Sequence, residues 1–279
     1  MVSITWTTTQ KQRLMELGAV QELATRTFGD AADRDQSFQR IESELVGANK
    51  QALMAHKGQG SRPVLNELGD KLIDCLRRQG FSQVNTPIII AKSTLERMTI
   101  TDDSPLAEQV FWVDHNKCLR PMLAPNLYSV MKDLYRQWGD PVRIFEIGSC
   151  FRKESQGKYH LNEFTMLNLV EMGVADGQQE NRLRALISMV MKAVGMTNYK
   201  VEKNSSEVYG ETIDVVCGDL ELSSGAYGPH SLDNLWGVFT PWVGLGIGVE
   251  RLAMALEGHR NIKRVGRSLS YWNGFRLNI

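Results

Sequence analysis

The chain has 279 residues, of which 42% are hydrophobic and 23% are charged, a composition typical of a globular enzyme with one large domain or two. Basic and acidic residues each number 32, so the net charge does not point to a polyanionic partner. No apolar run approaches the roughly 20 residues of a membrane-spanning helix, and residues 1–14 lack a signal core. We therefore expect a cytoplasmic protein. Its four cysteines lie far apart, which disfavours a zinc site or a disulfide framework.

The N-terminal part predicts a small helical segment. Residues 10–58 indicate two helical pieces, with Asp30 as a plausible N-cap before Phe38, Ile41 and Leu45 at helical spacing. The stretch GQGSRP, residues 58–63, has the glycines and proline of a linker. We therefore expect an N-terminal helical segment, 1–61, and one larger domain, 62–279.

The larger domain opens with an amphipathic helix over 64–79 that ends at Gly80. A strand interrupted by Pro87 follows; proline there indicates an edge or interface position. Residues 109–121 predict a hairpin that turns at Asp114, His115 and Asn116. The apolar spacing of residues 124–139 predicts another helix.

Two predicted strands, within 142–153 and 162–173, form a long antiparallel hairpin. A helix over 178–194, a strand pair over 211–228 turning at Gly218 and Asp219, and a glycine-rich strand running into a helix over 242–256 follow. Because the strands come in consecutive antiparallel runs, the pattern predicts an α+β fold, an antiparallel sheet flanked by helices, rather than a doubly wound parallel sheet.

The hairpin FRKESQGKYHLNEFTMLNL, residues 151–169, carries the first candidate site. The Arg152 guanidinium suits phosphate oxygens, and Glu154, two residues on, can accept from the exocyclic amine of a base. Phe164 on the return strand can stack on that base, and His160 can donate to outer phosphates. This predicts a nucleoside triphosphate site without a P-loop. The alternative is a charged hairpin with cross-strand ion pairs.

The stretch GLGIGVERL carries the second candidate site. Gly244, Gly246 and Gly248 alternate, which leaves one strand face bare for a flat ligand, and Arg251 enters in the first helical turn. The alternative is close packing of a helix on the sheet.

The stretch GDLELSSGA carries the third. Glu221 alternates with Ser223 on one expected strand face, and Ser224 begins the next segment. Their oxygens are hard ligands suited to Mg²⁺, although a lone strand glutamate more often faces solvent. A fourth feature, the segment from Gly258 onward, has five basic residues and no acid, and it predicts either a nucleic-acid contact or a solvated basic helix end. The five are Arg260, Lys263, Arg264, Arg267 and Arg276.

Taken in order, these features resemble motifs 1, 2 and 3 of the class II aminoacyl-tRNA synthetases. The segments CLRPMLAPNLY, FEIGSCFRKES, HLNEFTMLNL, VYGETIDV, GDLELSSGA and RSLSYWNG are similar to the catalytic domains of the pyrrolysyl-tRNA synthetase family, from about residue 62 to the last residue. The resemblance implies ATP-dependent activation of pyrrolysine and its transfer to the 3′ end of an amber-decoding tRNA, by a homodimer. Another class II synthetase, of phosphoseryl or phenylalanyl type, and a non-catalytic paralogue are the alternatives.

The resemblance also implies which residues bind ATP. Arg152 and Arg251 would be catalytic, and Glu221 and Ser224 would ligate Mg²⁺. The implied ATP site comprises Arg152, Lys153, Glu154, His160, Leu161, Asn162, Glu163, Phe164, Glu221, Leu222, Ser223, Ser224, Gly246, Gly248 and Arg251.

A second set is implied to bind the amino acid. Asn168 would anchor the side-chain amide of pyrrolysine, and Tyr209 would cover the bound side chain. Because this pocket would offer no carboxylate partner for an ammonium group, it would exclude free lysine. Ala226 and Tyr227 stand where some members have two valines, which would change the pocket depth, and Ile247 replaces a frequent Phe. The implied pocket comprises Ala124, Pro125, Asn126, Leu127, Tyr128, Met131, Asn168, Leu169, Val170, Tyr209, Ala226, Trp242 and Gly244.

The fused N-terminal tRNA-binding domain of some family members is expected to be absent here or supplied as a separate protein. The helices within 10–46 and the basic C-terminal segment are candidates for tRNA contact. The homodimer is expected to form through the helix 64–79 and the strand bearing Pro87.

Overall fold

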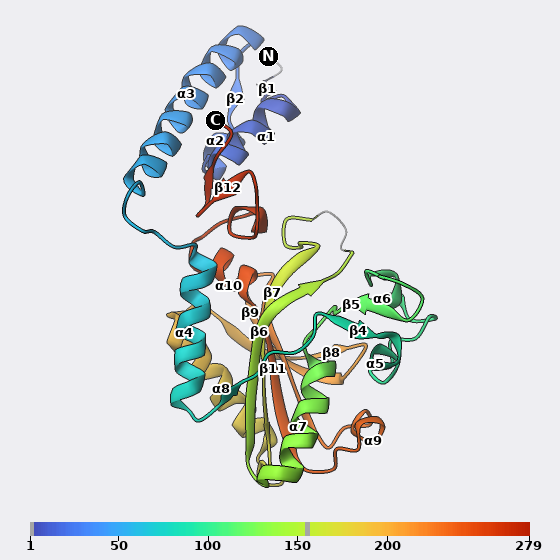
Figure 1. Ribbon diagram of the computed structural model, residues 1–279. Helices are drawn as coiled ribbons and strands as arrows, with labels where there is room; N and C mark the ends of the chain where they lie inside the picture. Colours follow the sequence, from blue (N-terminus) through green and yellow to red (C-terminus); the bar gives the residue numbers. More distant parts are fainter. Residues whose placement is uncertain (1–2, 154–156) are drawn as a thin grey trace. The chain divides into compact units, whose positions relative to one another are not determined.

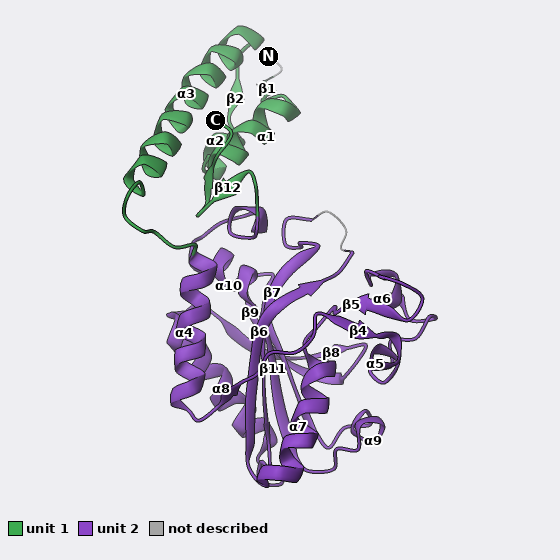
Figure 2. Ribbon diagram, viewed as in Figure 1, with its two compact units in different colours: residues 1–63, 268–279 green, residues 64–267 purple. Residues whose placement is uncertain are grey.

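The computed structural model describes residues 3–153 and 157–279. The chain forms two compact units (Figures 1 and 2). The terminal unit combines residues 1–63 with 268–279, and the sheet unit comprises residues 64–267. In the part of the chain that the model describes, no helix has the length and apolarity needed to cross a membrane.

The terminal unit is built around the long helix α3, and Asp30 caps it as predicted, since its carboxylate accepts from the backbone N of Asp33. Phe38, Ile41 and Leu45 pack with Trp6 and Phe28 in a small core. The elements of this unit are β1 (Ile4–Thr5), α1 (Thr8–Leu17), α2 (Gln21–Ala24), β2 (Thr27–Phe28), α3 (Ala31–Ala55), β12 (Tyr271–Trp272) and β13 (Phe275–Arg276).

The last residues of the chain pack in the terminal unit, whereas the sequence placed them in the larger domain. The backbone N of Arg276 donates to Asn49 Oδ1 at 3.1 Å, and the same arginine pairs with Glu16 at 2.6 Å. The Tyr271 hydroxyl donates to the carbonyl of Glu16. The hairpin β12–β13 therefore joins α1 and α3 through polar contacts.

The sheet unit contains a seven-stranded sheet in the order β3-β6-β7-β11-β10-β9-β8, and every neighbouring pair is antiparallel except β3 and β6. The predicted α+β class is confirmed. The strands are β3 (Ser82–Gln83), β6 (Val142–Phe151), β7 (Glu163–Met172), β8 (Lys200–Ser206), β9 (Gly210–Cys217), β10 (Leu220–Gly228) and β11 (Trp242–Gly248), with β4 (Ile89–Ala91) and β5 (Lys117–Leu119) in a separate two-stranded sheet.

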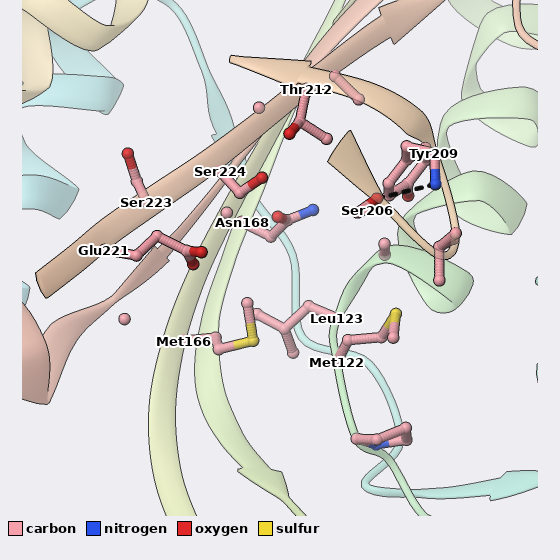
Figure 3. Close-up of a pocket in the computed structure, with 18 of the residues that line it drawn as sticks. Met122, Leu123, Met166, Asn168, Ser206, Tyr209, Thr212, Glu221, Ser223 and Ser224 are labelled. Carbon is pink, nitrogen blue, oxygen red and sulfur yellow. Dashed lines mark hydrogen bonds between the residues drawn. The ribbon is translucent and has the colours of Figure 1, made fainter. Parts of the chain in front are cut away.

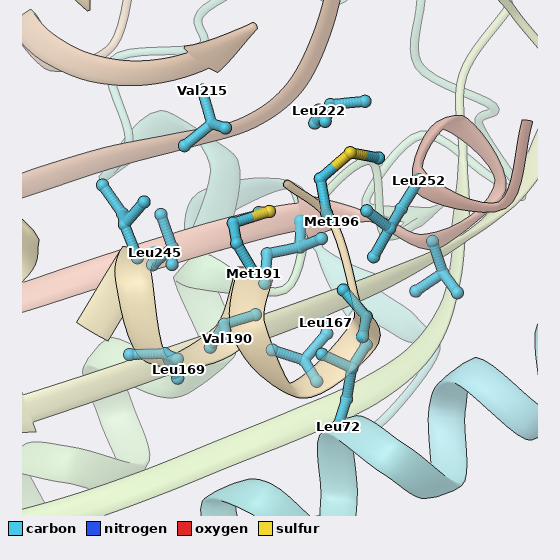
Figure 4. Packing of buried hydrophobic residues seen from close by; sticks show 14 of the residues in the cluster. Leu72, Leu167, Leu169, Val190, Met191, Met196, Val215, Leu222, Leu245 and Leu252 are labelled. Atoms are coloured by element: carbon cyan, nitrogen blue, oxygen red, sulfur yellow. The ribbon is translucent and has the colours of Figure 1, made fainter. Parts of the chain in front are cut away.

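Helices cover both faces of this sheet (Figure 1). On one face, α4 (Val64–Arg78), α8 (Gln179–Val194) and α10 (Val249–Leu256) enclose the main apolar core, seen in Figure 4. On the other, α7 (Ala124–Trp138) packs against β6 and β7. Because side chains alternate along a strand, Leu167 and Leu169 of β7 enter the first core, while Val170 enters the second. The remaining helices are α5 (Lys92–Glu96), α6 (Pro105–Glu108), α9 (Asp233–Trp236) and the 3₁₀ turn η1 (Ile262–Arg264).

Two local expectations differ from the structure. Pro87 lies between β3 and β4, in neither strand, because its ring has no N–H to donate to a ladder. The edge strand β8 was not foreseen, because its sequence is almost entirely polar and exposed.

Candidate active site

A cavity of about 530 Å³ opens on the face of the sheet that carries α7 (Figure 3). Its floor includes Gly244, Gly246 and Gly248 of β11, as the alternation predicts. A Cβ atom at Gly246 would lie 2.9 Å from Asn168 Oδ1 and 3.3 Å from Met166 Cε. The bare strand face is therefore needed for the neighbouring side chains as well as for a ligand.

One row of residues crosses four strands at the middle of this floor. Asn168 of β7 pairs with Gly246 of β11, which pairs with Ser224 of β10, which pairs with Asp214 of β9. Directly paired residues point to the same face of a sheet, and all four line the cavity. The row divides the cavity into a hairpin end, with Arg152, Phe164, Glu221 and Arg251, and a helix end, with Tyr128, Tyr209 and Trp242.

A β-bulge sets the orientation of the side chains in β10. Glu221 pairs with Val216 and Ser223 pairs with the adjacent Val215, so the register shifts between Glu221 and Ser223. Because Val216 and Asp214 share a strand face, their partners Glu221 and Ser224 share the cavity face. The expectation that Glu221 and Ser223 share a face is wrong: Ser223 points away from both (Figure 3). Its buried hydroxyl has no hydrogen-bond partner among the described residues.

Two arginines from different elements line the hairpin end. Arg152, directly after β6, donates through Nε to the carbonyl of Pro121 at 2.9 Å, and its Cζ lies 5.4 Å from the centre of the Phe164 ring. On α10, Arg251 Nη1 lies 3.4 Å from Glu221 Oε1 and donates to the carbonyl of Glu221 at 3.2 Å. The predicted Glu154 lies outside the described residues.

Most residues of the two implied sets line this one cavity. They are Ala124, Leu127, Tyr128, Met131, Arg152, His160, Leu161, Phe164, Asn168, Val170, Tyr209, Glu221, Leu222, Ser223, Ser224, Ala226, Trp242, Gly244, Gly246, Gly248 and Arg251.

Six others do not line it: Pro125, Asn126, Lys153, Asn162, Glu163 and Leu169. Leu169 points to the opposite core. Asn126 donates instead to Thr86 Oγ1 and to the carbonyl of Pro87, at 2.8 and 3.0 Å. Glu163 pairs with Arg267, 3.3 Å away.

The cavity wall also contains polar residues that sequence reasoning missed. The buried Asp214 accepts through Oδ2 from Asn204 Nδ2 at 2.9 Å, and its Oδ1, like Thr212 Oγ1, has no partner in the described structure. Glu221 is a carboxylate that the sequence predicts for the ATP site, and Asp214 is a further buried carboxylate in the same cavity wall. The alternation of Thr212 and Asp214 in ETIDV was the available signal, since it puts both on one face of β9.

Glu250, at the start of α10, is a second missed residue of the wall. Both of its carboxylate oxygens accept from the backbone N of Thr165 at 2.8 Å, and Arg267 Nη1 lies 3.5 Å from Oε1. Burial raises the pKa of Glu250, against the lowering effect of the Thr165 hydrogen bonds and of Arg267. Arg267, one of the five basic residues of the C-terminal segment, therefore forms its ion pairs within the sheet unit.

The family model of the tRNA synthetases class II core domain (F) matches residues 48–273. The crystal structure of pyrrolysyl-tRNA synthetase from Desulfitobacterium hafniense is 52% identical, with a TM-score of 0.94 over 100% of both chains. The chain belongs to the pyrrolysyl-tRNA synthetase family of class II. A second structure from the same organism, PylSc, is also 52% identical, with a TM-score of 0.92 over 99% of this chain and 96% of that one.

Other tRNA ligases match this pyrrolysyl-tRNA synthetase family member over shorter stretches. The O-phosphoserine–tRNA(Cys) ligase of Methanocorpusculum labreanum is 30% identical over 144 residues, which are 47% of this chain and 26% of that ligase. The histidine–tRNA ligase of Thermosipho africanus is 24% identical over 53% of this chain and 40% of its own length. The match thus spans less than half the length of these curated relatives.

Proposed function

We propose that this chain activates pyrrolysine with ATP and transfers it to the 3′ end of its cognate amber-decoding tRNA. The observation that carries the proposal is 52% identity over the full length of a pyrrolysyl-tRNA synthetase. The gathering of both implied residue sets around one cavity supports it. The reaction belongs to protein biosynthesis in the cytoplasm, where charged tRNA is used.

In the proposed first step, the carboxylate of the amino acid attacks the α-phosphorus of ATP in line and pyrophosphate leaves. The carboxylate is already a nucleophile, so the protein needs no general base. Its contribution is to orient the substrates and to neutralise the charge that develops on the phosphate. Arg152 and Arg251, which both line the hairpin end, suit this role, and Phe164 offers a face on which the adenine can stack.

Glu221 and Ser224 form a fitting pair of ligands for Mg²⁺. The bulge in β10 turns both oxygens to the cavity, and they are the hard donors that this ion prefers. Mg²⁺ usually takes its other ligands from phosphates and water, so two protein ligands suffice. When bound, the ion would supply charge neutralisation at the phosphates. The Glu221 carboxylate would then ligate the metal and would lose part of its contact with Arg251.

The helix end of the cavity suits a bulky neutral side chain. Its walls are mostly apolar, with Leu127, Met131 and Val170 among them, and Asn168 stands at its entrance as the amide that would hold the substrate amide carbonyl. A phosphoseryl substrate fits less well, because Arg152 and Arg251, the arginines that line the cavity, both lie at the hairpin end. The retained arginines likewise argue against a non-catalytic paralogue.

The partners are also part of the proposal. We place a homodimer interface on α4 and the Pro87 segment, where Ile88 and Ile89 are 44% and 51% exposed. A monomeric mass by light scattering at micromolar concentration would contradict it. For tRNA we propose the helices within 10–46 and the basic segment around Lys263. Salt-dependent binding of tRNA that is unchanged in a Lys263→Ala variant would argue against the latter.

The function is tested by pyrophosphate exchange with pyrrolysine, followed by aminoacylation of the amber-decoding tRNA. We expect exchange by the wild type and its loss, by about a hundredfold or more, in Arg152→Ala. The matched control is Arg136→Ala, at an exposed arginine of α7. Near-normal exchange in Arg152→Ala, or exchange by the wild type only with another amino acid, would overturn the proposal.

A further inference from the structure

A short turn after β10 holds a buried carboxylate that lies behind the cavity wall. Asp233, the first residue of α9, is 4% exposed and does not line the cavity. Its oxygens accept from Trp242 Nε1 at 3.0 Å, from the Tyr128 hydroxyl at 3.2 Å and from the backbone N of His230 at 2.6 Å. A buried carboxylate is stable when several donors satisfy it in this way. Asp233 therefore connects α7 and β11 behind the cavity wall.

His230 extends this network to the β8–β9 hairpin. Its Nδ1 accepts from the backbone N of Leu232 at 3.2 Å, so the proton of the neutral ring lies on Nε2. Nε2 then donates to the carbonyl of Tyr209 at 2.7 Å, and the two rings meet edge-on with centres 5.7 Å apart. His230 thus contacts Tyr209 through its backbone and its ring, without lining the cavity itself.

The Tyr209 side chain is hydrogen-bonded to Tyr128, and His230 is what holds the Tyr209 backbone. Tyr209 lies in the turn between β8 and β9, at the end of the edge strand β8, whose residues are almost all exposed. Within the turn, the backbone N of Tyr209 donates to Ser206 Oγ at 3.0 Å (Figure 3). Both partners of that hydrogen bond belong to the β8–β9 hairpin, so it does not connect the turn to the rest of the sheet unit. The bond from His230 ties the turn to the sheet unit beyond the hairpin.

We propose that His230 and Asp233 are positioning residues for the amino-acid pocket, which hold Tyr209, Tyr128 and Trp242 in one arrangement. The inference rests on the proposed function for its substrate. The three aromatic rings already contact one another: Tyr128 meets Trp242 with centres 5.5 Å apart, and Tyr209 meets Trp242 at 6.3 Å. Loss of the His230 contact would free the Tyr209 turn, and the pocket would hold a bulky side chain less well, while the ATP end would keep its residues.

The kinetic test compares His230→Ala, His230→Gln and the control His115→Ala, at an exposed histidine of another turn, in pyrophosphate exchange. We expect His230→Ala to raise KM for pyrrolysine about five- to tenfold, as for one lost hydrogen bond, with KM for ATP and kcat within about twofold. The Gln variant keeps an N–H donor and should recover part of the loss. Equal rises in both KM values, or no rise for pyrrolysine, would overturn the proposal.

A second measurement does not depend on the substrate. Amide hydrogen exchange of the peptide 204–212 should be faster in His230→Ala than in the wild type and unchanged in His115→Ala. In a Tyr209→Ala background, His230→Ala should add little to KM, because the two act through one contact. If the wild type does not activate pyrrolysine, the proposed function fails, and hydrogen exchange still decides whether His230 holds the turn. Unchanged exchange in this peptide would overturn the inference alone.

Discussion

The Arg120 guanidinium and the Glu146 carboxylate form an ion pair 2.7 Å long, with only 3% of each side chain exposed. Arg120 also donates to the carbonyls of Ser149 and Thr86, and Glu146 accepts from the backbone N and the hydroxyl of Thr86. Asn126, at the start of α7, donates to the same Thr86 hydroxyl. The pair therefore connects β6, the segment before Pro87 and the helix that forms one wall of the cavity.

Removing one partner of this pair should strongly destabilise the sheet unit. Glu146→Gln leaves the Arg120 charge buried without its counterion, which typically costs about 3–5 kcal/mol. Urea denaturation measures the change. The control is Arg136→Ala, from the exposed pair with Asp133, where we expect less than about 1 kcal/mol. If Glu146→Gln and Arg136→Ala lost the same free energy of unfolding, burial would not be what makes the Arg120–Glu146 pair costly to break.

Gly246→Ala should damage activity more than folding. The new methyl group would lie 2.9 Å from Asn168 Oδ1, so the Asn168 side chain must move, and the bare floor of the cavity would be covered. We expect kcat/KM in pyrophosphate exchange to fall about tenfold or more, because a shift of about 1 Å in a substrate-positioning residue can cost about a hundredfold in rate. Gly47→Ala in α3, where nothing lies within 4 Å, is the control and should leave activity unchanged.

Asn168→Ala should affect the amino acid rather than ATP. Without the amide, the substrate carbonyl would be buried with no donor, which costs about 1–3 kcal/mol, or about five- to 150-fold in KM for pyrrolysine. KM for ATP should stay within about twofold. Separate titrations of the two substrates in pyrophosphate exchange measure this. An equal rise of both KM values would show that Asn168 supports the whole cavity instead of anchoring one substrate.

Glu250 should make stability depend on pH. Burial raises its pKa above the ordinary 4.5, so its contribution to stability is fully present below that value and is lost as pH rises through the raised pKa. Relative to Glu250→Gln, the wild type should therefore lose unfolding free energy as the pH rises above about 4.5, as measured by urea denaturation. Glu257→Gln, at an exposed position, is the control. A difference between wild type and Glu250→Gln that is constant with pH would contradict this.

Strongly periodic segments made most of the sheet unit predictable. The hairpin β6–β7, the pair β9–β10, the strand β11 with α10, and the helices α4, α7 and α8 all follow from apolar spacing and turn residues. The same segments bring Arg152, Phe164, Glu221 and Arg251 to one cavity. The choice of pyrrolysine came from the family resemblance, since residue chemistry alone indicated only a nucleotide-binding enzyme.

The features that were missed depend on contacts between distant segments. The hairpin β12–β13 joins the terminal unit through Asn49 and Glu16, far away in the sequence. The bulge at Leu222 arises from pairing with β9 and has no local signal in GDLELSSGA. His230 and Asp233 act behind the cavity wall, so no motif of lining residues includes them.

Catalysis depends on the register of the paired strands, because the register brings together the row Asn168, Gly246, Ser224 and Asp214. If β11 slipped by one residue against its neighbours, every side chain in it would change face, and Leu245 and Ile247 would fill the cavity where glycines now lie. Such a slip would keep most backbone hydrogen bonds and still abolish the site. A misfolded form of this enzyme can therefore retain native-like secondary structure without activity, so circular dichroism alone cannot certify an active preparation.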